Sequence, residues 1–230
     1  MADALHLVFD LDGTLIDSAP QIHAATNIVF ANKGLPPFSE TTVRGFIGNG
    51  VDVLVHRLMA HHSLPEDASL HADLVADFIR IYEEAFDLTT LYPSVSTALD
   101  MLSARGHRLA VCTNKPEGPT RAVLRHFGLL PLFPVIIGGD TLPQRKPNPE
   151  PLHAAIAALG RGKALFIGDS EVDAETAHAA KVPLALFSRG YHRAPIESLN
   201  AKLIFDDHAA LPRLIAHLAP RICPRPQQIG

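Results

Sequence analysis

The stretch Leu7-Val8-Phe9-Asp10-Leu11-Asp12-Gly13-Thr14 decides the fold, because a short apolar run ends in two carboxylates, a glycine and a hydroxyl. In an extended strand, residues two apart point to the same side, so Asp10 and Asp12 can converge just beyond the end of this strand. Two carboxylates so close repel each other unless a divalent cation lies between them or one is protonated. The motif therefore predicts a chemically active site at the end of a strand.

The same motif has two other interpretations. A calcium-binding EF-hand loop fails, because Leu15 stands where that loop needs glycine and Gln21 stands where it needs glutamate. The preceding residues are also strand-like, whereas an EF-hand loop follows a helix. A pair of solvated aspartates in a turn is the second interpretation, and the residues described below argue against it.

Length and composition favour a globular protein. The chain has 230 residues, of which 47% are hydrophobic, and this is enough for one domain or for a core with a modest insert. The net charge is −4 and the basic residues are scattered, so we expect a small polar ligand and neither nucleic acid nor a membrane as partner. No apolar run reaches the roughly 18 residues of a membrane span, and no signal-peptide pattern is present, so we expect a cytoplasmic protein.

Cysteine and histidine give no metal-binding pattern. Cys112 and Cys223 are the two cysteines, and we interpret both as free thiols. None of the 13 histidines forms a convincing ligand pair, and we expect His61 and His62 to lie at the end of a helix.

From Pro93 onward, short apolar strands alternate with helices. This alternation is typical of a parallel sheet with helices on both faces, and it predicts an α/β, Rossmann-like core. Besides the first strand, the expected strands are 108–112, 135–137, 164–167, 184–187 and 203–205, and the expected helices are 94–105, 116–127, 149–159, 171–180 and 208–218.

A helical segment is inserted before this alternation begins. Ser18 is expected to cap a helix that runs to about Asn32 and stops at Gly34. Residues 39–87 keep apolar side chains at helical spacing and show no strand pattern. The expected organisation is a core of residues 1–16 and 89–219, an α-helical cap of residues 17–88, and a disordered tail at 220–230.

Polar residues follow the strands of the predicted sheet. In parallel α/β folds the site lies at the carboxyl ends of the strands, where these residues should meet. Each of them could instead be an ordinary strand, loop or capping residue, but four strand ends with the same character favour a site. They are Asp10 and Asp12 after the first strand, Thr113, Asn114 and Lys115 after the second, Lys146 beyond the third, and Asp169 and Asp173 after the fourth.

These residues favour a phosphate ligand and Mg²⁺. Four carboxylates close together would cost several kcal/mol without a counter-charge. Oxygen ligands without histidine or cysteine select a hard cation such as Mg²⁺. Lys146, the Thr113 hydroxyl and the backbone N–H groups around Asn114 could then hold a tetrahedral oxyanion.

At these positions the sequence resembles the haloacid dehalogenase superfamily of aspartyl-phosphate hydrolases. The similarity covers essentially residues 5–218, with its four motifs in the right order, and residues 17–88 resemble the small α-helical cap of that superfamily. Three loop motifs, 47–51, 113–116 and 137–140, resemble those of phosphoglycolate phosphatases.

The resemblance implies a mechanism in two steps. Asp10 is expected to attack phosphorus and form an aspartyl-phosphate, while Asp12 protonates the leaving alkoxide and later activates water. Lys146 and Thr113 would hold the phosphoryl oxygens. Mg²⁺ would be held by Asp10, the main-chain carbonyl of Asp12 and Asp169, with Asp173 orienting Lys146 or water.

Substrate choice is expected to come from a glycine-rich loop of the cap. Arg44, Gly48, Asn49 and Gly50 are the candidates there, and Arg44 could meet the carboxylate of phosphoglycolate. A plain turn between helices with a solvated arginine is an equally good interpretation.

Five rival functions share parts of this pattern. A dehalogenase of this fold needs no acid at Asp12, and a phosphonate hydrolase would need a cap lysine, for which Lys33 is the only candidate. A β-phosphoglucomutase-like phosphotransferase, or a phosphatase for another sugar phosphate, shares the core motifs. A phospho-ligand binding protein would not need Asp12. Oligomeric state is not predicted.

Overall fold

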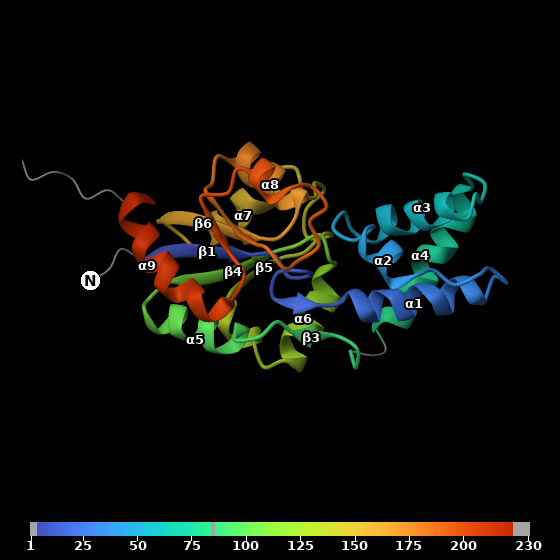
Figure 1. Ribbon diagram of the computed structural model, residues 1–230, viewed down its shortest axis with the longest axis horizontal. Helices are drawn as coiled ribbons and strands as arrows, with labels where there is room; N and C mark the ends of the chain where they lie inside the picture. The colour runs from blue at the N-terminus through green and yellow to red at the C-terminus, as the bar shows by residue number, and fades with distance from the viewer. Residues whose placement is uncertain (1–3, 84–85, 223–230) are drawn as a thin grey trace, which may run out of the picture.

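The computed structural model describes residues 4–83 and 86–222, and its centre is a six-stranded parallel sheet covered by helices (Figure 1). The strand order is β5-β4-β1-β6-β7-β8, with the Asp10 strand, β1, at the centre. These strands are β1 (Leu5–Phe9), β4 (Arg108–Cys112), β5 (Val135–Ile137), β6 (Lys163–Gly168), β7 (Leu184–Phe187) and β8 (Leu203–Phe205). The predicted α/β fold is confirmed.

The sheet separates two hydrophobic layers. Along β1, Leu7 and Phe9 point into one layer and Val8 into the other, because successive side chains of a strand alternate between faces. One layer is closed by α5 (Val95–Ala104), α6 (Glu117–His126) and α9 (Leu211–Ile222), and the other by α7 (Glu150–Ala158) and α8 (Glu171–Ala180). Burial on both faces explains the continuous apolar runs of these strands.

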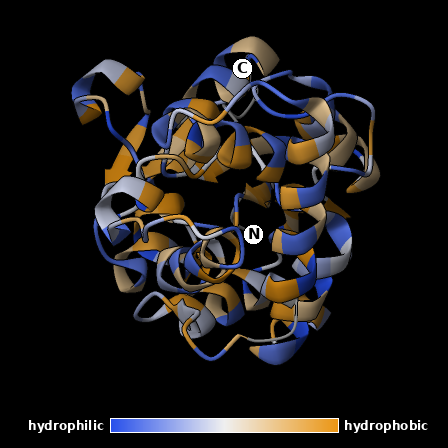
Figure 2. Cartoon of the chain, turned by 90° about the vertical axis from the view of Figure 1, so that its right-hand side faces the viewer, coloured by the Kyte–Doolittle hydropathy of each residue, from blue (hydrophilic) through white to orange (hydrophobic). Residues whose placement is uncertain are grey.

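Four helices form a separate group at one end of the molecule, which we call the helical insert (Figure 1). They are α1 (Ala19–Ala31), α2 (Glu40–Arg44), α3 (Val51–His61) and α4 (Ala68–Glu83). Their apolar faces pack together in a hydrophobic cluster of their own, which includes Phe30, Val43, Leu58 and Leu74. Figure 2 views the molecule from this end and shows hydrophobic and hydrophilic stretches on the same helices, as expected for amphipathic helices.

A short two-stranded ribbon joins the helical insert to the sheet. β2 (Ile16–Asp17) pairs antiparallel with β3 (Thr90–Leu91) where the chain leaves for the insert and where it returns. Two-residue strands leave no periodic pattern in a sequence, so the ribbon was not predicted.

Three smaller expectations need correction or qualification. Ser18 precedes α1 but makes no side-chain cap, because its hydroxyl donates to Asp12. Helix α9 ends at Ile222 and not at 218, so the predicted tail begins with helical residues, since Ala219 is buried and Ile222 packs on the core. The remainder of that tail, with Cys223, lies outside the described residues. Within the described ranges, no helix combines the length and apolarity of a membrane span.

Candidate active site

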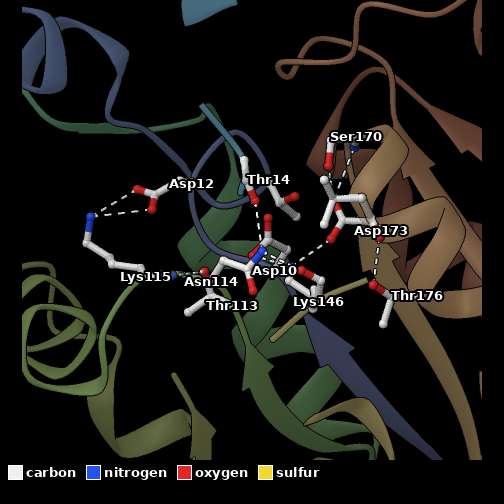
Figure 3. A network of polar contacts seen from close by, with 12 residues as sticks. Asp10, Asp12, Thr14, Thr113, Asn114, Lys115, Lys146, Ser170, Asp173 and Thr176 are labelled. Carbon is white, nitrogen blue, oxygen red and sulfur yellow. Dashed lines mark hydrogen bonds and ion pairs between the residues drawn. The ribbon is translucent and has the colours of Figure 1, made fainter. Parts of the chain in front are cut away.

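The predicted residues do meet at the carboxyl edge of the sheet (Figure 3). Asp10 follows β1, Thr113 follows β4, Asp169 follows β6, and Lys146 lies on the loop after β5. All four are buried, with exposed fractions of 7%, 4%, 1% and 4% respectively. Charged groups are rarely buried without a partner, so Asp10, Lys146 and Asp169 each need a compensating contact.

Lys146 compensates two of the carboxylates. Its Nζ lies 2.9 Å from Asp10 Oδ1 and 2.7 Å from Asp173 Oδ1. Burial alone would lower the pKa of Lys146, but Asp10 and Asp173 raise it above its usual range. The ammonium is therefore a permanent positive charge beside Asp10.

Asp173 has a structural task as well as an electrostatic one. Its Oδ2 accepts hydrogen bonds from the backbone N–H groups of Asp169 and Ser170 and from the Ser170 hydroxyl at the start of α8. The residue is fully buried, and its other oxygen holds Lys146. Asp173 therefore caps a helix and contacts the lysine at the same time.

The carboxylates form a cluster suited to a hard cation. Asp10, Asp169 and Asp173 each offer an oxygen, and these atoms lie within 4.8 Å of one another. Burial, together with repulsion from Asp173, raises the pKa of Asp10 to about 6 despite Lys146, and burial also raises the pKa of Asp169. A divalent cation would relieve this repulsion, and a set of oxygen ligands is what Mg²⁺ prefers.

The neighbours of Asp169 hold it toward this cluster. Its Oδ1 accepts from Thr14 Oγ1 at 2.6 Å, and its Oδ2 accepts from the backbone N–H of Tyr191 at 2.6 Å. Gly13 makes room for the carboxylate, because a Cβ atom there would lie 2.4 Å from Asp169 Oδ2 and Gly13 has a φ of +89°. The glycine of the first motif is therefore required by close approach and by backbone conformation.

The carboxylate of Asp12 lies outside the cluster and faces the helical insert. It accepts from Ser18 Oγ at 2.6 Å. It also accepts from Lys115 Nζ at 3.2 Å (Figure 3). The two aspartates of the motif therefore have different partners, since Asp10 pairs with Lys146 and Asp12 pairs with Lys115.

Lys115 is a residue of the second strand end to which the sequence analysis gave no role. It is 8% exposed, its Nζ donates to the Tyr82 hydroxyl at 2.5 Å, and the same atom lies 4.2 Å from the centre of the Tyr82 ring. Its place directly after Thr113 and Asn114 was a signal that could have been used. Its partner could not be found in that way, because Tyr82 comes from α4 of the helical insert.

A small cavity of about 80 Å³ lies between the strand ends and the helical insert. Gly48 and Gly50 line it, as predicted for the insert loop, and Asn114 Nδ2 donates to the Gly48 carbonyl at 3.0 Å. The remaining lining residues are polar at the sheet edge and mostly apolar on the insert: Asp10, Asp12, Ile22, Ile47, Val51, Leu54, Phe78, Ile79, Tyr82, Thr113, Asn114, Lys115, Pro116 and Pro119.

Two predicted residues of the insert loop lie elsewhere. Arg44 does not line the cavity, because its Nη2 is paired with Asp17 at 3.2 Å and with Glu40 at 3.3 Å. Asn49 accepts a hydrogen bond from Arg57 and also lies outside the cavity lining. In this arrangement the charge of Arg44 is used at the ribbon that joins the insert to the sheet, and a contact between Arg44 and the substrate stays a prediction.

Comparison with known proteins agrees with this geometry. The family model of haloacid dehalogenase-like hydrolases matches residues 7–187. A phosphoglycolate phosphatase of Cereibacter sphaeroides is 49% identical, with 92% of this chain and 98% of the relative covered. A phosphoglycolate phosphatase of Rhodobacter capsulatus is 43% identical, with 91% and 95% covered.

Solved structures show the same fold. The crystal structure of a predicted phosphoglycolate phosphatase from Haemophilus somnus superposes with a TM-score of 0.86 at 33% identity, and covers 93% of this chain and 98% of that one. The family match extends over most of the chain, and it includes Asp10, Asp12, Thr113, Lys146 and Asp169. The chain therefore belongs to the family of haloacid dehalogenase-like hydrolases.

Proposed function

We propose that this phosphatase hydrolyses phosphoglycolate to glycolate and phosphate through an aspartyl-phosphate on Asp10, with Mg²⁺ as cofactor. The observation that carries the proposal is the position of Asp10 on the floor of the cavity, with Lys146 2.9 Å away and Asp169 and Asp173 beside it. The choice of phosphoglycolate as substrate rests on the relatives named above, which are called phosphoglycolate phosphatases.

The first step is attack by an Asp10 oxygen on phosphorus. The P–O bond to the substrate alkoxide breaks as the new bond to Asp10 forms, and the equatorial oxygens need positive charge and donors. Lys146 supplies the charge, while the Thr113 hydroxyl and the backbone around Asn114 supply donors at the same edge. Asp173 acts through Lys146, because it fixes the ammonium in place.

Asp12 moves the protons. In the first step its carboxyl group protonates the departing alkoxide, and in the second the resulting carboxylate takes a proton from the water that attacks the acyl phosphate. Its carboxylate lies on the insert side of the cavity, beside Ser18 and Lys115 and outside the carboxylate cluster, so it is not needed to hold the cation.

The carboxylate cluster fits the cofactor. Asp10, Asp169 and the main-chain carbonyl of Asp12 would hold Mg²⁺, which neutralises phosphoryl oxygens when it is bound. Burial raises the pKa of both Asp10 and Asp169, and a divalent cation would favour the ionised forms of these carboxylates.

We further propose that residues 17–88 act as a cap. Three contacts hold the insert against the core around the cavity: Asn114 to Gly48, Arg145 to Asp52 at 2.6 Å, and Arg193 to the Gly45 carbonyl at 3.0 Å. Gly50 approaches the core so closely that a Cβ atom there would lie 3.3 Å from the Asn114 carbonyl. Closure of this kind excludes water from the acyl phosphate.

The test is phosphate release from a panel of small phosphoesters with and without Mg²⁺. We expect Mg²⁺-dependent release from phosphoglycolate. Transfer to a second hydroxyl of a sugar bisphosphate would identify a mutase, and binding without turnover of any ester would identify a phospho-ligand binding protein. A phosphonate hydrolase is disfavoured, because no lysine of the described insert lines the cavity and Lys33 pairs with Asp77.

A further inference from the structure

We propose that the ammonium of Lys115 binds a carboxylate on the leaving portion of the substrate, and so selects phosphoesters of small hydroxy acids. The inference rests on the proposed phosphatase activity and assigns a specificity residue to the same site. It replaces Arg44, which lies outside the cavity.

The ammonium of Lys115 lies close to the place where the scissile oxygen of the substrate would bind. Lys115 Nζ lies 3.2 Å from Asp12 Oδ1, and Asp12 is the group that would protonate the scissile oxygen. In phosphoglycolate a single CH₂ group separates that oxygen from the carboxylate. A substrate whose scissile oxygen meets Asp12 therefore brings its carboxylate within reach of the same ammonium.

The ammonium of Lys115 also has a hydrogen-bond donor available for a ligand. An ammonium group has three protons, and two of them are used by Asp12 Oδ1 and the Tyr82 hydroxyl. The remaining contact, to Asp12 Oδ2, is long at 3.4 Å. One donor can therefore turn to a ligand, while Tyr82 of the insert and Asp12 of the core keep the ammonium in position.

The rest of the cavity wall offers a substrate carboxylate no other positive charge among the described residues. Among the described residues that line the cavity, Lys115 is the one basic side chain. On the insert side the wall is mostly apolar, with Ile47, Leu54 and Phe78 among its residues. In such surroundings an ion pair is stronger than in water, and an anionic leaving group without a partner would be excluded.

A second interpretation gives Lys115 only a positioning role toward Asp12. The two interpretations predict different results, because loss of a group that merely positions Asp12 harms every alkyl phosphate alike. Loss of a carboxylate-binding group harms only the esters that carry a carboxylate. A pair of substrates that differ in that group alone therefore separates them.

The experiment compares kcat/KM for phosphoglycolate and for ethyl phosphate, which has the same chain length without a carboxylate. For Lys115→Met we expect a loss on phosphoglycolate that exceeds the loss on ethyl phosphate by about tenfold to a hundredfold. Lys33→Met removes an exposed lysine of the insert and is the matched control. It should leave both values unchanged.

Binding supplies a readout that does not need turnover. In an Asp10→Asn background, calorimetry should show that Lys115→Met raises the Kd of phosphoglycolate by about tenfold or more. The Kd of ethyl phosphate should rise by about threefold at most. Removal of one member of a buried ion pair can unfold a protein, so thermal melting checks the variant. If it does not fold, Lys115→Met combined with Asp12→Asn removes both charges and repeats the binding comparison.

The outcomes separate this inference from the proposed function. A wild-type protein that releases no phosphate from either ester contradicts the proposed function, and the binding comparison still decides on Lys115. Equal losses on the two esters overturn the inference and make Lys115 a positioning residue for Asp12. Unchanged values on both esters overturn it as well, and leave Lys115 as a structural contact between core and insert.

Discussion

Two buried lysine–aspartate pairs stand on either side of the same motif, and they differ in where their third partner comes from. Lys146 pairs with Asp10 and is held by Asp173 of α8, so all three belong to the sheet and the segments that follow its strands. Lys115 pairs with Asp12 and is held by Tyr82 of α4, so this group forms only when the helical insert lies against the sheet (Figure 3 shows both lysines).

The difference indicates a division of labour. The group around Lys146 is formed by hydrogen-bonded residues of the core alone, which suits a phosphoryl group that is the same in every substrate. The group around Lys115 joins two parts of the molecule and faces a mostly apolar wall, which suits recognition of the part that varies. Substitutions on the two sides should therefore have different signatures.

The largest effect on activity is expected for a substitution in the group around Lys146. Asp10→Asn replaces the nucleophile by a neutral amide of nearly the same shape, and kcat should fall by about 10⁴-fold or more on every substrate. Steady-state phosphate release measures this loss. Asp100→Asn, at an exposed position of α5, is the control and should retain full activity. An unchanged kcat for Asp10→Asn would remove Asp10 from the mechanism.

The next effect depends on the leaving group. Asp12→Asn removes the proton donor, so we expect kcat/KM to fall by about 10²- to 10⁴-fold on alkyl phosphates. An aryl phosphate should lose much less, because a phenolate leaves without a proton. The ratio of the two losses is the measurement. Equal losses would mean that Asp12 mainly holds Lys115 and Ser18 in place.

Removal of the cation should affect the Lys146 side without distinguishing between leaving groups. We expect exhaustive chelation to lower activity by at least about a hundredfold, since several kcal/mol of charge stabilisation is lost, and Mg²⁺ to restore it. Ca²⁺ should inhibit, because its coordination is larger and looser.

A thermal melt gives an independent check on the cation. Binding to the folded state alone stabilises it, by about 2.7 kcal/mol at a hundredfold excess over Kd, so Mg²⁺ should raise the Tm of the wild type. Asp169→Asn should abolish that increase, because Asp169 is one of three buried residues that offer an oxygen to the cluster. Full activity after chelation, or an equal Tm shift in Asp169→Asn, would contradict the assignment.

The contrast between the two sides also explains what the sequence could and could not predict. Parallel strands deliver the residues that follow them to one edge, so strand pattern alone was enough to bring Asp10, Thr113, Lys146 and Asp169 together. Tyr82 and Lys115 are far apart in the sequence. Their contact depends on how the helical insert packs against the sheet. No local periodicity encodes that packing.

The contacts of Arg44 at the ribbon could not be predicted for a similar reason. The sequence left Arg44 as a substrate-binding or a solvated residue, because a two-residue strand has no recognisable pattern. In the structure Asp17 lies on β2, accepts from the Tyr191 hydroxyl at 2.8 Å, and pairs with Arg44. A charge that seemed free for a substrate is thus already committed to a contact that only tertiary structure creates.

The smallest effect is therefore expected for Arg44→Ala. Its side chain is one-third exposed, and exposed ion pairs contribute about 0.2–1 kcal/mol, so the free energy of unfolding should fall by that amount. A double-mutant cycle with Asp17→Ala should return a coupling of the same size.

Activity distinguishes Arg44 from the residues of the cavity. Because Arg44 is held at the ribbon and does not line the cavity, kcat/KM should change by about threefold at most, and equally, on phosphoglycolate and ethyl phosphate. Equal but larger losses would show that the ribbon contact helps the insert to close over the sheet. A loss of tenfold or more on phosphoglycolate alone would instead place Arg44 against the substrate in a different arrangement of the insert, and the carboxylate would then have two candidate partners in place of Lys115 alone.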